Sequence, residues 1–87
     1  MASTQAATLF VDTSAWVALL YRRDQAHRRA ASAWPSIREG RRLLVTTNLI
    51  LAESHATLSR RLGAMAGLAF LDRMAFRPHQ RIVWADI

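Results

Sequence analysis

Two acidic side chains follow apolar runs of the kind that form buried strands. Asp12 comes directly after the run 8–11, and Glu53 follows the run 43–45 and the polar junction 46–48. An ionised acid would be costly inside a core, but the carboxyl end of a parallel strand is where open α/β sheets bind their ligands. The sequence therefore predicts that both carboxylates lie at one edge of a parallel sheet.

Two carboxylates placed together favour a bound cation. Like charges about 4 Å apart repel by roughly 4 kcal/mol at an effective dielectric constant of about 20, so such a pair usually needs a proton or a cation. Hard oxygen ligands suit Mg²⁺ or Mn²⁺, which makes Asp12 and Glu53 candidate metal ligands and catalytic residues. The pattern alone also allows a simpler interpretation, in which Asp12 only caps the next helix and Glu53 lies on the surface.

Other polar residues could support or replace this site. Thr13, Ser14 and Asn48 could hydrogen-bond a metal ligand or a metal-bound water, although all three also suit helix capping. His27, His55 and His79 are far apart in sequence, and the chain has no cysteine, so a zinc site has little support. His55 is expected to be a packed or interface residue.

Three apolar runs predict the strands that position these residues. They cover about residues 8–11, 42–46 and 81–85. The runs are continuous rather than alternating, as expected when helices cover both faces of a parallel sheet.

Four helical stretches separate the strands, which gives βαβ units. The first stretch spans 14–21; the second begins after a cap at Asp24 and should kink at Pro35 or end just before it. The third runs from a cap at Thr47 or Asn48 to about residue 61, and the fourth spans about 65–76. The expected fold class is α/β, a three-layer sandwich with a parallel sheet, and residues 1–87 form a single domain.

The charge and composition indicate a polyanionic partner. The formal net charge is +6, and all twelve basic residues are arginine, which favours bidentate contacts to phosphate. Some of the arginine pairs could steer RNA, whereas Trp16, Trp34 and Trp84 are expected to pack in the core rather than stack on bases. No segment resembles a signal peptide or a membrane span, so we expect a cytoplasmic protein without a membrane partner.

The segments around the two acids resemble a known family. Residues 11–15, Val-Asp-Thr-Ser-Ala, followed by residues 46–53, Thr-Thr-Asn-Leu-Ile-Leu-Ala-Glu, are similar to the start of a PIN domain, in particular that of VapC-type ribonuclease toxins of bacterial toxin–antitoxin pairs. Residues 24–27 and 60–63 also fit that pattern. The resemblance implies that Asp12 and Glu53 bind a divalent cation for RNA cleavage.

One departure from the family affects the expected activity. Family members carry further acids, usually two, in a second half after the third strand, whereas this sequence ends at Ile87. The resemblance therefore covers only the front of the family's fold, and we expect an incomplete acidic site with impaired cleavage. Asp86 is interpreted as a strand-end residue rather than as a displaced ligand.

The sequence supports two functional hypotheses. The first is a divalent-metal-dependent endoribonuclease, the toxin of a toxin–antitoxin pair, with RNA and a cognate antitoxin as partners. The second is a non-catalytic interaction module that retains antitoxin-binding and dimer surfaces. The first strand is expected to be a sheet edge, and an unpaired edge promotes a homodimer or a higher oligomer.

Overall fold

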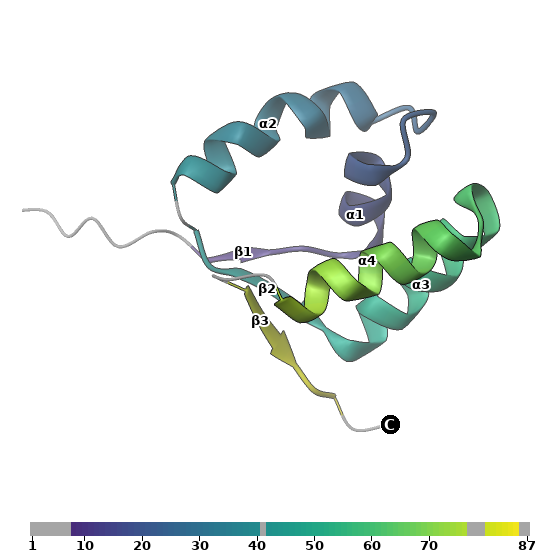
Figure 1. Cartoon of the computed structure of the whole chain (residues 1–87). Coiled ribbons are helices and arrows are strands. Elements are labelled where there is room, and N and C mark those ends of the chain that lie inside the picture. Colours follow the sequence, from purple (N-terminus) through teal and green to yellow (C-terminus); the bar gives the residue numbers. More distant parts are fainter. Residues whose placement is uncertain (1–7, 41, 77–79, 86–87) are drawn as a thin grey trace, which may run out of the picture.

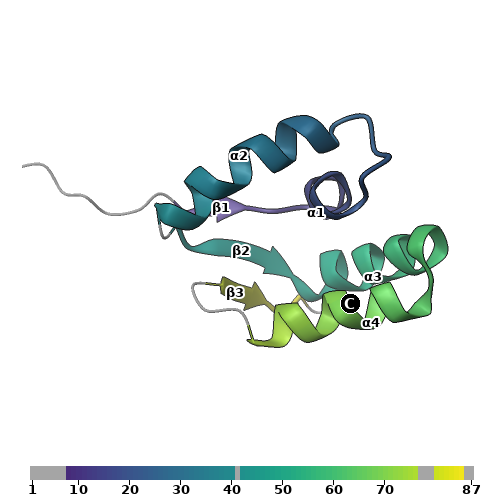
Figure 2. The ribbon, with the colours of Figure 1, turned by 45° about the horizontal axis from the view of Figure 1, so that its top comes forward.

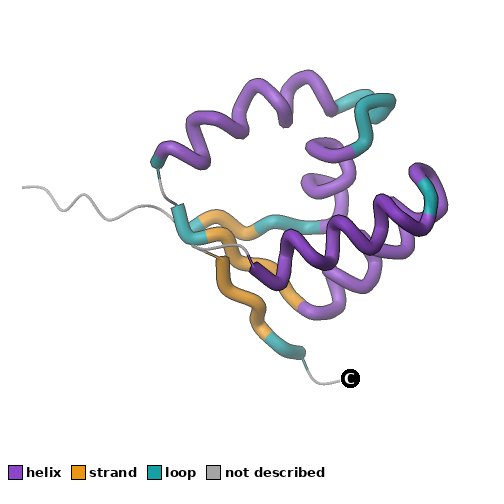
Figure 3. The backbone as a smooth tube through the Cα atoms, viewed as in Figure 1, coloured by secondary structure: helices purple, strands orange, loops and turns teal. Residues whose placement is uncertain are grey.

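The computed structural model describes residues 8–40, 42–76 and 80–85 and shows two helices after each of the first two strands (Figure 1). In chain order the elements are β1 (Leu9–Phe10), α1 (Thr13–Leu20), α2 (His27–Glu39), β2 (Leu44–Thr47), α3 (Asn48–Leu62), α4 (Ala64–Phe76) and β3 (Gln80–Val83). Figure 3 shows how short the strands are beside the helices. The predicted α/β fold with three strands and four helices is confirmed.

The three strands form one parallel sheet in the order β1-β2-β3. Leu44 in β2 is in register with Leu9 in β1 and Gln80 in β3. Pairing continues past the two-residue β1, because the Val11 N–H donates to the Val45 carbonyl at 2.8 Å. Within the described part of the chain, β1 is therefore an edge strand, as the sequence predicted.

The helices cover one face of this sheet. Val11 and Leu44 point to that face and belong to the same core as side chains from α1, α3 and α4. The connections from β1 to β2 and from β2 to β3 step in the same direction across the sheet. Because such parallel connections are right-handed, both helix pairs lie on the same side of the sheet. Phe10 and Val83 lie on the opposite face of the sheet and are exposed.

The prediction for the third strand was partly wrong. β3 occupies Gln80–Val83, and its residues alternate between half-buried and exposed instead of being buried throughout. Trp84 was expected in the core but is 75% exposed. A continuous apolar run does not reveal whether both faces are covered. Only one face is covered here, so the described residues form two layers rather than the expected three.

Trp16 is the centre of the hydrophobic core. Its side chain is 1% exposed, and its ring meets Phe70 of α4 edge to face with centroids 5.8 Å apart. Leu58 of α3 is also 1% exposed and completes the contact among three helices. The expectation that Trp16 packs in the core is confirmed, whereas Trp34 is only half-buried at the rim.

Helices α3 and α4 form a tight antiparallel pair, visible side by side in Figures 1 and 2. Gly63 joins them with a positive φ of 98°, which glycine adopts without strain. Gly67 is buried, and a Cβ there would overlap the Ser59 hydroxyl and press on the His55 ring. His55 is therefore a packed residue, one of the two roles expected from its position.

The second helix differs from the prediction at both ends. Helix α2 continues through Pro35 to Glu39 rather than ending near Trp34. Its N-cap is Ala26, with no side-chain cap, because Asp24 instead accepts a hydrogen bond from the Ala26 N–H in the preceding turn at 3.0 Å. No residue of α2 is fully buried, so the helix lies on the core without entering it.

No helix in residues 8–40, 42–76 or 80–85 has both the length and the apolar character needed to cross a membrane.

Candidate functional site

Strand β1 delivers Asp12 to the start of α1. The Thr46 side chain is fully buried, and its hydroxyl donates to the Val11 carbonyl at 3.0 Å. Together with the bond from the Val11 N–H to the Val45 carbonyl, this fixes the backbone on both sides of Val11. Asp12 follows in an extended conformation and emerges beyond the carboxyl end of the strand.

Asp12 is the N-cap of α1. Its Oδ1 accepts hydrogen bonds from the Ala15 N–H at 3.0 Å and from the Ser14 hydroxyl at 2.8 Å. These bonds, that of Ala15 first, lower the pKa of Asp12 below its usual value. The carboxylate is therefore ionised at neutral pH, which is the state that a cation requires.

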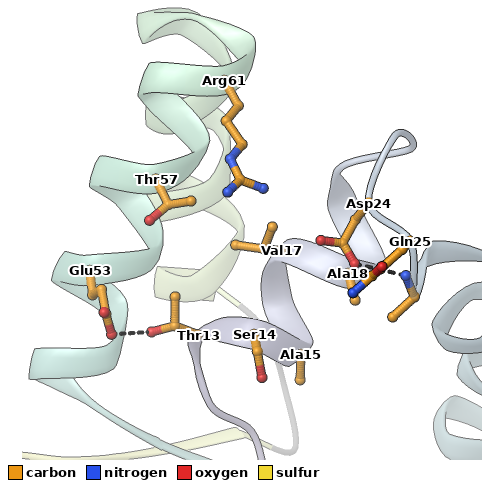
Figure 4. Close-up of a pocket in the computed structure, with 11 residues that line it drawn as sticks. Thr13, Ser14, Ala15, Val17, Ala18, Asp24, Gln25, Glu53, Thr57 and Arg61 are labelled. Carbon is orange, nitrogen blue, oxygen red and sulfur yellow. Dashed lines mark hydrogen bonds between the residues drawn. The ribbon is translucent and has the colours of Figure 1, made fainter.

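Glu53 reaches the start of α1 from α3. The Thr47 hydroxyl accepts from the Ile50 N–H at 3.1 Å and caps the helix, so Glu53 stands in its second turn. The Thr13 hydroxyl donates to Glu53 Oε1 at 2.6 Å, as the dashed line in Figure 4 shows. Because Thr13 adjoins Asp12 in the chain, this bond brings the second acid to the start of α1.

A hollow of about 610 Å³ opens beside these residues. Thr13 and Ser14 line it from α1, and Glu53, Thr57 and Arg61 line it from α3 (Figure 4). The remaining lining residues come from α1 and from the turn before α2: Ala15, Val17, Ala18, Asp24, Gln25 and Ala26. The hollow is open, and its wall combines the charged side chains of Asp24, Glu53 and Arg61 with small apolar ones.

The donor chemistry fits a hard divalent cation, but the set of ligands is small. Asp12 and Glu53 offer carboxylate oxygens, with the Thr13 and Ser14 hydroxyls beside them. Among residues 8–40, 42–76 and 80–85 no three His, Cys, Asp or Glu side chains are grouped closely enough to hold a metal. Asp86 lies outside the described residues, and the assignment of Asp12 and Glu53 as ligands stays a prediction.

The two candidate supporting residues have different surroundings. Ser14 contacts a candidate ligand directly, because it donates to Asp12. Asn48 bonds the backbone of Ala85 instead: its Oδ1 accepts from the Ala85 N–H at 2.7 Å, and its Nδ2 donates to the Ala85 carbonyl at 3.5 Å. Asn48 thus ties the chain after β3 to the first turn of α3.

Thr13 has a more specific role than the sequence indicated. The sequence suggested that its hydroxyl could hydrogen-bond a metal ligand or cap the helix, but nothing in the sequence brings residues 13 and 53 together. Its side chain is the direct link between the two acidic segments. The sequence shows that Thr13 places a hydroxyl directly after the strand-end acid Asp12. Its partner, Glu53, is identified only by the position of α3.

The two described histidines, His27 and His55, make contacts that stabilise the fold. His27 Nδ1 lies 2.8 Å from the Ala18 carbonyl and joins α2 to α1. His55 packs against Gly67, and His79 lies outside the described residues.

The fold is similar to that of a solved structure with moderate sequence identity to this chain. The crystal structure of VapC20 from Mycobacterium tuberculosis, described as a sarcin–ricin loop cleaving toxin, matches with a TM-score of 0.75 and 29% identity. The match covers 90% of this chain and 57% of that chain, so this sequence spans little more than half the length of its structural neighbour.

No curated protein matches the chain in a sequence search. The PIN domain family model does match, over residues 9–86, which is nearly the whole sequence and includes both candidate acids. The resemblance inferred from the residues around Asp12 and Glu53 is thereby confirmed: the chain belongs to the PIN domain family.

Proposed function

We propose that this chain is part of a divalent-metal-dependent endoribonuclease, the toxin of a toxin–antitoxin pair. The hydrogen bond between Thr13 and Glu53 is the observation that carries the proposal, because it brings the second acid to the strand end where Asp12 stands. The match to the PIN domain family and the similarity to a VapC toxin support the same activity.

Each residue of the site has a distinct part in the proposed reaction. The Ala15 N–H and the Ser14 hydroxyl hold the Asp12 carboxylate in its charged form, and Thr13 fixes the direction of Glu53. A Mg²⁺ or Mn²⁺ ion held by the two acids would polarise the phosphodiester and activate water for in-line attack. The net charge of +6 favours the approach of an RNA backbone to the protein.

We expect the 87-residue polypeptide to cleave RNA weakly or not at all. Two carboxylates supply few of the about six oxygen ligands that Mg²⁺ takes, so the attacking water is poorly placed. The assay incubates the chain with Mn²⁺ and a structured RNA hairpin, including the sarcin–ricin loop named for the structural neighbour. Robust cleavage that Glu53→Gln abolishes would contradict the expected weakness and establish the nuclease.

Apolar surface on α4 and the edge at β1 support partners for this chain. Met65 is 81% and Leu68 58% exposed on α4, and Phe10 is 59% exposed at β1. These surfaces suit a cognate antitoxin or a second copy of the chain, since exposed apolar patches and unpaired strand edges both promote association.

We therefore expect self-association when no partner is present. Light scattering over a concentration series should give a mass that rises above 9.8 kDa, with two-fold dimers the commonest species. Met65→Glu together with Leu68→Glu should shift the equilibrium toward the monomer if α4 is the contact. A wild-type chain that stays monomeric at high concentration would contradict this expectation.

The same surfaces favour one alternative, a non-catalytic interaction module. In that case the antitoxin or a second copy would bind, but Asp12 and Glu53 would have no cation between them. Cation titration distinguishes the two proposals. In either case we propose a cytoplasmic location without a membrane partner.

A further inference from the structure

Arg61 lies on the same face of α3 as the candidate metal ligand Glu53. Glu53, Thr57 and Arg61 are spaced by four residues, and all three line the hollow (Figure 4). Four-residue spacing places side chains one above another, and eight residues span about 12 Å of helix. One rigid helix thus presents both a carboxylate and a guanidinium to the hollow.

The Arg61 side chain is oriented before any ligand binds. Its guanidinium carbon lies 5.2 Å from the centroid of the Tyr21 ring, within the range of a cation–π contact. Tyr21 is half-buried against the core, so the ring is a fixed support. In the part of the chain that the structure describes, no carboxylate forms an ion pair with Arg61, which leaves its donors available.

The neighbouring arginine provides a contrast. Arg60 is also exposed on α3, but it does not line the hollow and has no ring support among the described residues. The two arginines have the same charge, and they are adjacent in sequence. Any difference between them in RNA binding would therefore come from position and not from net charge.

We propose that Arg61, supported by Tyr21, is a positioning residue that binds a phosphate of the RNA strand beyond the phosphate to be cleaved. Guanidinium binds phosphate in a bidentate manner, and stacking on an aromatic ring leaves its in-plane donors free for that contact. Arg61 is attached to α3 two helical turns after Glu53, so it offers the RNA backbone a contact separate from the candidate metal ligand. This inference rests on the proposed nuclease function and adds the site that holds the substrate backbone.

The test is RNA binding without metal. Fluorescence anisotropy with a single-stranded RNA oligomer, in buffer with EDTA, gives Kd over a series of salt concentrations. Arg61→Gln should weaken binding about tenfold and reduce the salt slope by about 1, as expected for one lost phosphate contact. Arg60→Gln should change Kd by less than about twofold.

Three further variants separate position from folding. Arg61→Lys keeps the charge but loses the bidentate fork, so its affinity should fall between those of wild type and Arg61→Gln. Tyr21→Phe should bind as wild type does, whereas Tyr21→Leu, which removes the ring support, should bind more weakly. Circular dichroism establishes that each variant is folded.

Equal effects of Arg61→Gln and Arg60→Gln would overturn the inference, and so would a wild-type chain that binds no RNA at low salt. Because the assay contains EDTA, a failed metal site leaves the result unchanged. Metal binding at Asp12 and Glu53 without an Arg61 effect would overturn this inference alone.

Discussion

Asp12→Asn should abolish Mn²⁺ binding and leave the protein folded. Asparagine caps a helix about as well as aspartate, so α1 keeps its bonds from Ala15 and Ser14 while the negative charge is lost. Glu53→Gln should have the same effect, because the Gln oxygen can still accept from Thr13. In isothermal titration the wild-type chain should bind Mn²⁺ weakly, and neither variant should release measurable heat.

Asp12→Ala is the matched control for the cap. It removes both the charge and the acceptor, so it should also lower the free energy of unfolding by about 1 kcal/mol. The stability of the fold should also depend on pH through Asp12, because folding lowers the pKa of this carboxyl. The stabilisation that its charged form provides is present above the unfolded pKa and is lost as the pH falls through the folded pKa. Asp12→Asn binding Mn²⁺ as tightly as wild type would disprove the two-carboxylate site.

Trp16→Ala should remove most of the folding free energy and leave the protein only marginally stable at room temperature. A buried Trp→Ala change costs about 3–5 kcal/mol, and small domains have total stabilities of about 5–15 kcal/mol, with short chains near the lower end. Trp16 is 1% exposed and joins α1 to Phe70 of α4, so its truncation leaves a cavity between these helices. Urea unfolding followed by circular dichroism measures the loss directly.

Trp16→Phe is the informative companion variant. The Trp16 Nε1 is buried without a hydrogen-bond partner among the described residues, so the indole N–H contributes a desolvation cost. Phenylalanine keeps the edge-to-face contact with Phe70 and removes that N–H. Its stability should lie much closer to wild type than that of Trp16→Ala, and equal losses in the two variants would show that the ring contact contributes little.

The order of the elements could be predicted from the sequence because its local signals agree. Thr47 and Gly63 mark the start and the end of α3: the Thr47 side chain caps the first turn, and Gly63 ends the helix with a positive φ. Pro35 was misjudged because a proline penalty of about 3 kcal/mol is a local cost that packing can offset, and Trp34 and Ile37 on either side both pack on the core. Trp84 was misjudged because a strand pattern does not specify which sheet faces are covered.

The sequence predicted the two acids of the candidate site but not the contacts that position them. The chain position of Asp12 after β1 is a local property, whereas the hydrogen bond from Thr13 to Glu53 joins residues forty apart. The place of Arg61 over Tyr21 likewise depends on how α3 packs beside α1. Such long-range contacts require the tertiary structure, because spacing in sequence fixes only which residues share an element.

The close approach of α3 and α4 at Gly67 affects which parts of the fold can open locally. Helices α3 and α4 meet so closely at Ser59 that one cannot separate without exposing the buried side chains of both, Leu58 and Phe70 among them. Helix α2 has no fully buried residue and contacts the core only through half-buried side chains, so its backbone amides should exchange with solvent faster than those of α3. Glu53 and Arg61 therefore stand on the slowly exchanging part of the molecule, while the opposite rim of the hollow, at Gln25, borders the part that opens first.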